Sequence, residues 1–154
     1  MEVTDTLAHL VGMWTVERTI RDHRAGADGS FEGALSVTTE PGGLGARHRR
    51  ARYEERGRFR LGGHDGPAAR SLLCVGREDG SALLHFADGR PFVVCDLRSG
   101  TWRACHPCAE DRYDLRFTVV AAAVLEEHWR VRGPAKDYEA WTTYRRVGAR
   151  TGAS

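Results

Sequence analysis

The hydrophobic period of this chain changes at Gly12-Met13-Trp14, and the new period recurs almost to the C-terminus. Before this tripeptide, apolar residues have helical spacing over 4–11 behind the candidate N-caps Thr4 and Asp5, which predicts one short helix. From Trp14 onward, apolar and polar residues alternate strictly, as they do in a half-buried β-strand. A chain of this kind is constrained to begin with a helix and continue as a sheet.

The alternation repeats in about ten short segments. The predicted strands are 14–21, 31–37, 53–61, 71–75, 82–86, 92–97, 102–108, 113–119, 125–131 and 138–147. Turn signals separate them at Gly26 to Gly29, Gly42-Gly43, Gly62-Gly63, Asp79-Gly80 and Asp88-Gly89. Evenly spaced short strands are typical of an all-β sandwich or barrel. We expect a single domain over 1–148 and a flexible polar tail over 149–154.

Composition excludes several classes of protein. With 154 residues, 41% hydrophobic and 29% charged, the chain fits one globular domain. Its apolar runs fall short of the roughly 20 residues that span a bilayer, and its first residues lack a signal-peptide layout, so we expect a cytoplasmic protein with no membrane partner. A formal net charge of +2 argues against nucleic acid as a partner. A monomer or a homodimer is expected.

The four cysteines raise the question of redox or metal chemistry. Cys105 and Cys108 have the C-x-x-C spacing, but no helical period follows them, as it would in a thioredoxin-type motif. Zinc needs two further ligands, and no second close pair of cysteines exists. Thiols in strands are more often small buried hydrophobes, and no metal site is predicted.

The order of these elements resembles the calycin superfamily of lipocalins and fatty-acid-binding proteins. A short helix, Gly12-x-Trp14, a meander of hairpins and an arginine-bearing last strand at Tyr144-Arg145-Arg146 carry the resemblance. It implies an antiparallel up-and-down β-barrel of about ten strands, with the N-terminal helix closing one end. It also implies that Arg145 or Arg146 packs across the ring of Trp14.

Three sequence segments resemble, more narrowly, those of a small bacterial family of lipocalin-like proteins with no settled activity. They are Phe86 to Phe92, then His106-Pro107-Cys108 with Asp111 and Tyr113, then Gly133 to Tyr138. This resemblance supports the fold and leaves the function open.

Several polar residues share strand parity with apolar ones, which predicts that they point into the barrel. Glu55 has the parity of Tyr53 and Phe59, and Glu127 has that of Leu125 and Trp129. The full predicted set is Arg18, Glu55, His106, Cys108, Asp111, Tyr113, Glu127, Trp129, Tyr138, Thr142, Tyr144 and Arg146. A carrier of plain fatty chains does not need so polar an interior.

Two interpretations of this interior stay open. Because isolated buried carboxylates are costly, Glu55 and Glu127 must pair with Arg18, Arg146, His106 or tyrosine hydroxyls, or else hold protons. A closed structural network of such pairs is one interpretation. The other is a polar pocket in which a carboxylate or His106 moves a proton on a bound molecule, with desolvation raising the carboxylate pKa toward the working pH.

The sequence therefore predicts a small-molecule-binding barrel. The first hypothesis is a cofactor-independent enzyme of specialised metabolism that performs proton-transfer chemistry such as cyclisation, isomerisation or dehydration. Its catalytic candidates are His106, Glu55, Asp111 and Tyr113, and its ligand-binding candidates are Arg18, Glu127, Trp129, Tyr138, Thr142, Tyr144, Arg146 and Cys108. The alternative is a non-catalytic carrier or sensor of a small metabolite. No cofactor is expected, and parity leaves His106 as the one candidate ligand for haem.

Overall fold

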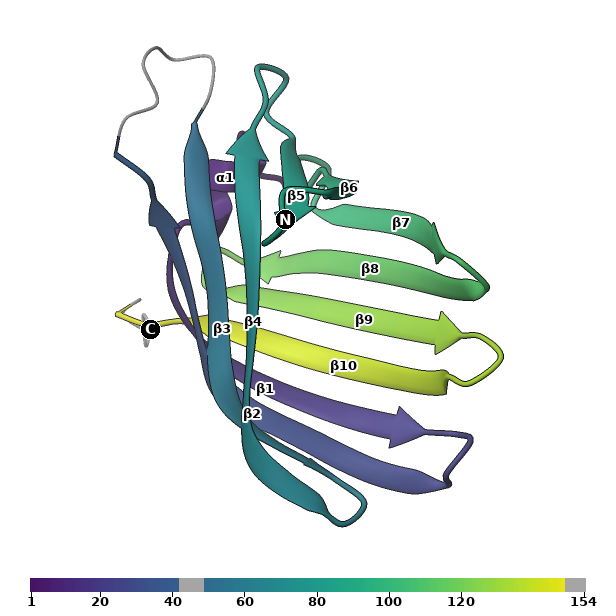
Figure 1. Ribbon diagram of the computed structural model, residues 1–154. Helices are drawn as coiled ribbons and strands as arrows, with labels where there is room; N and C mark the ends of the chain where they lie inside the picture. The colour runs from purple at the N-terminus through teal and green to yellow at the C-terminus, as the bar shows by residue number, and fades with distance from the viewer. Residues whose placement is uncertain (42–48, 149–154) are drawn as a thin grey trace.

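Ten antiparallel strands form one continuous sheet that rolls into a nearly closed barrel (Figure 1). The structure is a computed structural model that describes residues 1–41 and 49–148. Its elements are α1 (Thr6–Leu10), β1 (Gly12–Asp22), β2 (Ala27–Thr39), β3 (Arg50–Leu61), β4 (His64–Gly76), β5 (Ala82–Phe86), β6 (Pro91–Cys95), β7 (Thr101–Cys108), β8 (Asp111–Ala121), β9 (Val124–Arg132) and β10 (Asp137–Arg146). The predicted all-β barrel with a short N-terminal helix is confirmed. The predicted turn at Gly42-Gly43 and the predicted tail over 149–154 lie outside the described residues.

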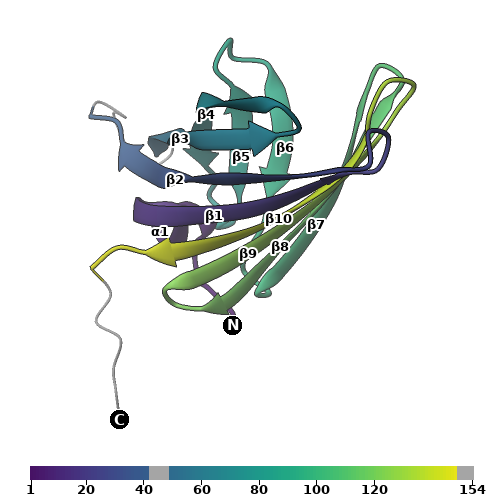
Figure 2. The same cartoon turned by 90° about the horizontal axis from the view of Figure 1, so that it is seen from below.

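The strands follow an up-and-down order in which β1 pairs with both β2 and β10. The two edges of the sheet are therefore β6 and β7, which are consecutive in the chain. Figure 2 shows β3–β6 as one wall, and β1 with β7–β10 as the other. None of the described helices is long and apolar enough to cross a membrane.

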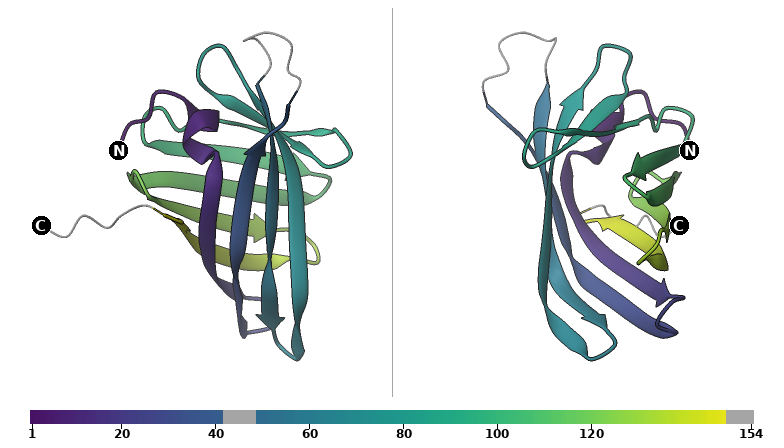
Figure 3. Two further views of the ribbon diagram at one scale, coloured as in Figure 1. Left: turned by 90° about the vertical axis from the view of Figure 1, so that its left-hand side faces the viewer. Right: turned by 45° about the vertical axis from the view of Figure 1, so that its right-hand side comes forward.

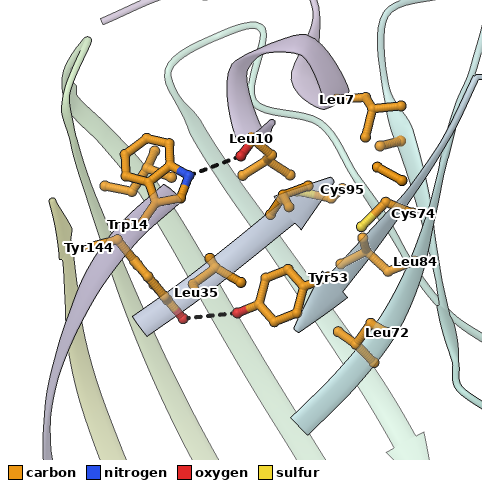
Figure 4. Packing of buried hydrophobic residues seen from close by; sticks show 14 of the residues in the cluster. Leu7, Leu10, Trp14, Leu35, Tyr53, Leu72, Cys74, Leu84, Cys95 and Tyr144 are labelled. Carbon is orange, nitrogen blue, oxygen red and sulfur yellow. Dashed lines mark hydrogen bonds between the residues drawn. The ribbon is translucent and has the colours of Figure 1, made fainter. Parts of the chain in front are cut away.

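The helix α1 lies at one end of the barrel, where it contacts β4 (Figure 3). It begins at Asp5, whose Oδ1 accepts a hydrogen bond from the backbone N–H of Ala8 at 2.8 Å, an N-cap as the sequence predicts. Leu7 and Leu10 are buried against the barrel core, and Trp14 Nε1 donates to the carbonyl oxygen of Leu10 at 2.9 Å (Figure 4). The apolar core thus fills the helix end of the barrel.

The Gly12-x-Trp14 motif has a direct physical explanation. Gly12 has a φ of +136°, and a Cβ at this position would lie 2.6 Å from Nη1 of Arg146. The Arg146 guanidinium lies 4.1 Å from the centre of the Trp14 ring and donates to the carbonyl oxygens of Val11 and His9. The predicted arginine–tryptophan contact is confirmed, and the arginine is Arg146.

One flank of the barrel is less complete than the sequence predicts. The strand β4 begins at His64, seven residues before the predicted 71–75, but only Leu72 to Gly76 also pair with β5. Residues 64–71 pair with β3 alone and form an edge. Pro67 lies in this stretch opposite Arg58, which is tolerated because proline lacks the N–H that an inner strand would need.

Candidate functional site

Four of the twelve side chains that parity places inside the barrel are fully buried in the structure. Glu55 and Glu127, with 2% and 3% of their surface exposed, are buried together with Thr142 and Tyr144. The arginines that alternate with this face of β3 are exposed: Arg50, Arg52, Arg56, Arg58 and Arg60. Strand period therefore locates Glu55, Glu127, Thr142 and Tyr144 in the barrel interior.

Arg18 and Glu55 form the centre of this interior. Arg18 Nη1 donates to Glu55 Oε1 at 2.8 Å and Nη2 donates to Glu55 Oε2 at 3.1 Å, a two-pronged contact. The Nε of Arg18 donates to Thr142 Oγ1 at 2.8 Å, and its guanidinium lies 5.2 Å from the centre of the Phe31 ring. Strands β1, β2, β3 and β10 are joined by this one side chain.

Two tyrosines extend the network. Tyr144 donates to Glu127 Oε2 at 2.7 Å, and Tyr53 donates to Glu55 Oε2 at 3.1 Å. Their hydroxyl oxygens lie 3.4 Å apart (Figure 4). Burial raises the pKa of both phenols, so they remain protonated donors at neutral pH.

Arg70 of β4 completes the network from the open flank. Its Nη2 donates to Tyr53 OH at 2.9 Å and to Glu55 Oε2 at 3.2 Å. Its guanidinium also stacks on the rings of Tyr53 and Trp129, 5.4 and 5.5 Å from their centres. We call Arg18, Tyr53, Glu55, Arg70, Glu127, Thr142 and Tyr144 the interior polar cluster.

The pocket interpretation expects a raised carboxylate pKa, whereas the pKa of Glu55 is lowered. Burial acts to raise the pKa of Glu55, but the charges of Arg70 and Arg18 and their hydrogen bonds outweigh it, so this pKa is lowered. Both carboxylate oxygens already accept hydrogen bonds. Glu55 is an ionised partner of two arginines, and the geometry gives it the structural role.

Five rings gather beside the polar cluster. We call Phe86, Phe92, His106, Tyr113 and Trp129 the aromatic cluster; all five are half-buried. The Phe92 ring lies edge-on to His106 at 5.2 Å and tilted to Trp129 at 6.0 Å, and Tyr113 meets Trp129 edge-on at 6.2 Å. Arg70, stacked on Trp129, connects the two clusters.

Phe92 reaches this position through a β-bulge. Leu84 pairs with Val93 and His85 pairs with Pro91, so Phe92 is skipped in the register of β5 and β6. Its ring contacts Phe86, His106 and Trp129 across the barrel. Strand alternation does not foresee such a residue.

A separate ion pair lies where β8 begins. Lys136 Nζ contacts Asp111 Oδ2 at 2.7 Å and donates to Tyr113 OH at 2.9 Å. These hydrogen bonds raise the pKa of Lys136, which is therefore a charged, paired ammonium at neutral pH. Tyr138 is half-buried nearby, and burial raises its pKa.

The structure does not bring every predicted residue to one place. Arg146 lies at the opposite end, bound to Trp14 and to the carbonyl oxygens beside α1. Cys108 is exposed at the end of β7. Cys105 is also exposed and has the opposite strand parity, and neither cysteine forms a disulfide. Within the described residues, no three histidine, cysteine, aspartate or glutamate side chains gather in a way that could hold a metal ion.

Two residues that matter to the site were not predicted. Arg70 was missed because the strand was expected to start at Ser71; extending the parity of Leu72 and Cys74 upstream would have found it. Tyr53 has the parity of Glu55 and was treated only as an apolar neighbour.

Solvent access divides the barrel at the polar cluster. On the α1 side, the inward residues Trp14 and Tyr144 are 0% and 1% exposed. Arg70, which also points inward, keeps 30% of its side chain exposed, and the aromatic cluster is half-buried. We call this side the distal half; the rings of the aromatic cluster and Arg70 are partly exposed there.

A groove also lies on the outer face of β7–β9, with a volume of about 460 Å³. Arg103 and Arg116 line it, and so do Arg112 and Arg130, which are already paired with Asp114 and Asp137. The groove is formed by long, exposed side chains, in contrast to the fixed rings of the distal half.

Fold and interior together define a calycin-type barrel with a polar and aromatic interior. The chain belongs to a family described as "Family of unknown function (DUF6314)", whose model matches residues 10–146. None of the curated proteins matches it.

The chain is similar to several solved structures at low sequence identity. The S-type phycobiliprotein lyase CPES from Guillardia theta is 12% identical, with a TM-score of 0.66 over 95% of this chain and 93% of the lyase. A protein of unknown function from the DUF3598 family of Nostoc punctiforme is 9% identical, with a TM-score of 0.46 over 92% of this chain and 49% of the other. The redesigned β-barrel mFAP1 bound to DFHBI is 11% identical, with a TM-score of 0.46 over 91% and 97%.

Proposed function

We propose that this barrel binds a small organic molecule in its distal half, against the aromatic cluster. The observation that carries the proposal is that five inward-facing rings and Arg70 are partly exposed, whereas Trp14 and Tyr144 are buried. Aromatic walls with a few fixed polar groups are the usual lining of a small-molecule site. The incompletely paired flank of β4 supplies a route to it.

A titration with the dye anilinonaphthalene sulfonate tests this proposal. Saturable binding with blue-shifted emission is expected, and Trp129→Ala should raise the dissociation constant about tenfold or more, because a large aromatic contact of roughly 1.5–3 kcal/mol is lost. Trp141→Ala is the matched control, since Trp141 is 44% exposed and stacks on His128 outside the barrel. Equal effects of the two variants would refute an interior site.

The position of His106 supports a second proposal, in which the barrel is an enzyme and His106 is its general base. Its ring lies in the aromatic cluster, and its nitrogens form no hydrogen bond with the described residues, so one of them is free to accept a proton from a bound molecule. Glu55 is not the base in this proposal, because its oxygens are occupied. Without such a reaction, the site is that of a carrier or sensor.

Nitrobenzisoxazole is a suitable probe for a general base in an aromatic site. His106 would take the ring C–H proton, the N–O bond would break, and cyanophenolate would form, which is followed by its absorbance. We expect turnover above buffer that His106→Ala removes while dye binding is retained, with His128→Ala as control. Turnover unaffected by His106→Ala, or absent in the unaltered protein, contradicts a catalytic His106.

A further inference from the structure

We propose that Arg70 is the anchor for an acidic group, and that the ligand of the distal half is a planar aromatic or conjugated acid. This inference rests on the proposed function and adds the chemical class of the ligand. It would be a carboxylate or sulfonate whose ring packs in the aromatic cluster.

The first argument is the hydrogen bonding of Arg70. Only Nη2 of its three guanidinium nitrogens is used, for Tyr53 and Glu55. Nε is buried without a hydrogen-bond partner among the described residues, and Nη1 forms no hydrogen bond with them either. Unused guanidinium donors beside an apolar wall are suited to an anionic oxygen.

The second argument is the distribution of charge. Arg18 contacts both carboxylates of the cluster, Glu55 at 2.8 Å and Glu127 at 3.7 Å. Arg70 contacts Glu55 alone, through an oxygen that also accepts hydrogen bonds from Arg18 and Tyr53. Arg70 therefore has one ion pair where Arg18 has two, and its side chain is the more exposed of the two, at 30% against 14%.

The third argument is position. Arg70 stacks on Trp129, whose Nε1 is also buried without a hydrogen-bond partner among the described residues. The ring of Trp129 continues through Phe92 and Tyr113 to the rest of the aromatic cluster. A flat molecule lying against these rings has its acidic end next to Arg70.

A matched pair of dyes tests the class of ligand. Anilinonaphthalene sulfonate carries a sulfonate, and N-phenylnaphthylamine has the same rings without it. We expect the unaltered protein to bind the sulfonate at least tenfold more tightly. Arg70→Gln should remove most of this preference and change the affinity for the neutral dye less than threefold.

Two further variants keep the test decisive. Arg70→Lys retains the charge and should retain part of the preference, which covers the case in which Arg70→Gln does not fold. Arg103→Gln, in the outer groove, should leave the preference for the sulfonate dye unchanged. Tight binding of both dyes that is insensitive to Arg70 would overturn the anchor while leaving the site intact; binding of neither dye would overturn the proposed function itself.

Discussion

Glu55 is the residue on which the interior depends most. Its carboxylate lies between the guanidinium groups of Arg18 and Arg70 and is 2% exposed. Removing one partner of a buried ion pair leaves the other charge uncompensated, which is more costly than the pair itself is stabilising. At the residue scale, this carboxylate is what allows two arginines inside a small barrel.

Glu55→Gln should therefore destabilise the protein strongly. We expect a loss of about 3–5 kcal/mol in the free energy of unfolding, measured in urea, because the guanidinium groups of Arg18 and Arg70 would then face an amide. The control is Glu54→Gln, the outward neighbour, whose contact with Arg56 is a surface pair at 3.6 Å and whose loss should cost about 0.5 kcal/mol or less. A similar cost for both variants would contradict the pairing.

The same carboxylate predicts a pH dependence. The folded-state pKa of Glu55 lies below the unfolded value of 4.5, so its stabilising contribution is present above pH 4.5 and is lost as pH falls toward the folded pKa. The stability difference between the unaltered protein and Glu55→Gln should shrink steadily below pH 4.5. A difference that stays constant between pH 7 and 3 would show that Glu55 is not ionised in the barrel.

At the scale of elements, Arg146 attaches α1 to the barrel. Arg146→Ala removes the stacking on Trp14 and two hydrogen bonds to carbonyl oxygens next to the helix, so we expect a loss of about 2 kcal/mol, or roughly 4–8 °C in the thermal midpoint. Arg145→Ala is the control, because that side chain is exposed and should change stability by no more than about 0.5 kcal/mol. Indistinguishable melting of the two variants would contradict the attachment.

The incompletely paired flank of β4 gives a second prediction at this scale. Hydrogen exchange measured by mass spectrometry should be faster for residues 64–71, which pair with β3 alone, than for Leu72 to Gly76, which pair on both sides. Uniform protection along β4 would mean that this edge is covered in solution.

Strand alternation predicted the fold and most of the interior because both follow from a period of two. Arg18, Glu55 and Glu127 were located correctly since each lies within a regular strand. Arg70 lies outside the predicted strand 71–75, whereas β4 begins at His64 and includes it. The inward position of Phe92 does not follow from strand alternation, because a bulge has no periodic signal.

At the scale of the whole molecule, the barrel has a sealed half and an accessible half. The helix, Trp14 and the apolar core close one end, and the polar cluster separates them from the aromatic cluster. The polar cluster holds two arginines and two glutamates, and Nε of Arg70 has no hydrogen-bond partner among the described residues.

The most direct test of an occupied distal half is a crystal structure of the protein with bound anilinonaphthalene sulfonate. We predict electron density for the dye between Trp129 and Phe92, with its sulfonate within hydrogen-bonding distance of Arg70. Density confined to the outer groove beside Arg103 and Arg116, with the distal half unchanged, would contradict the account.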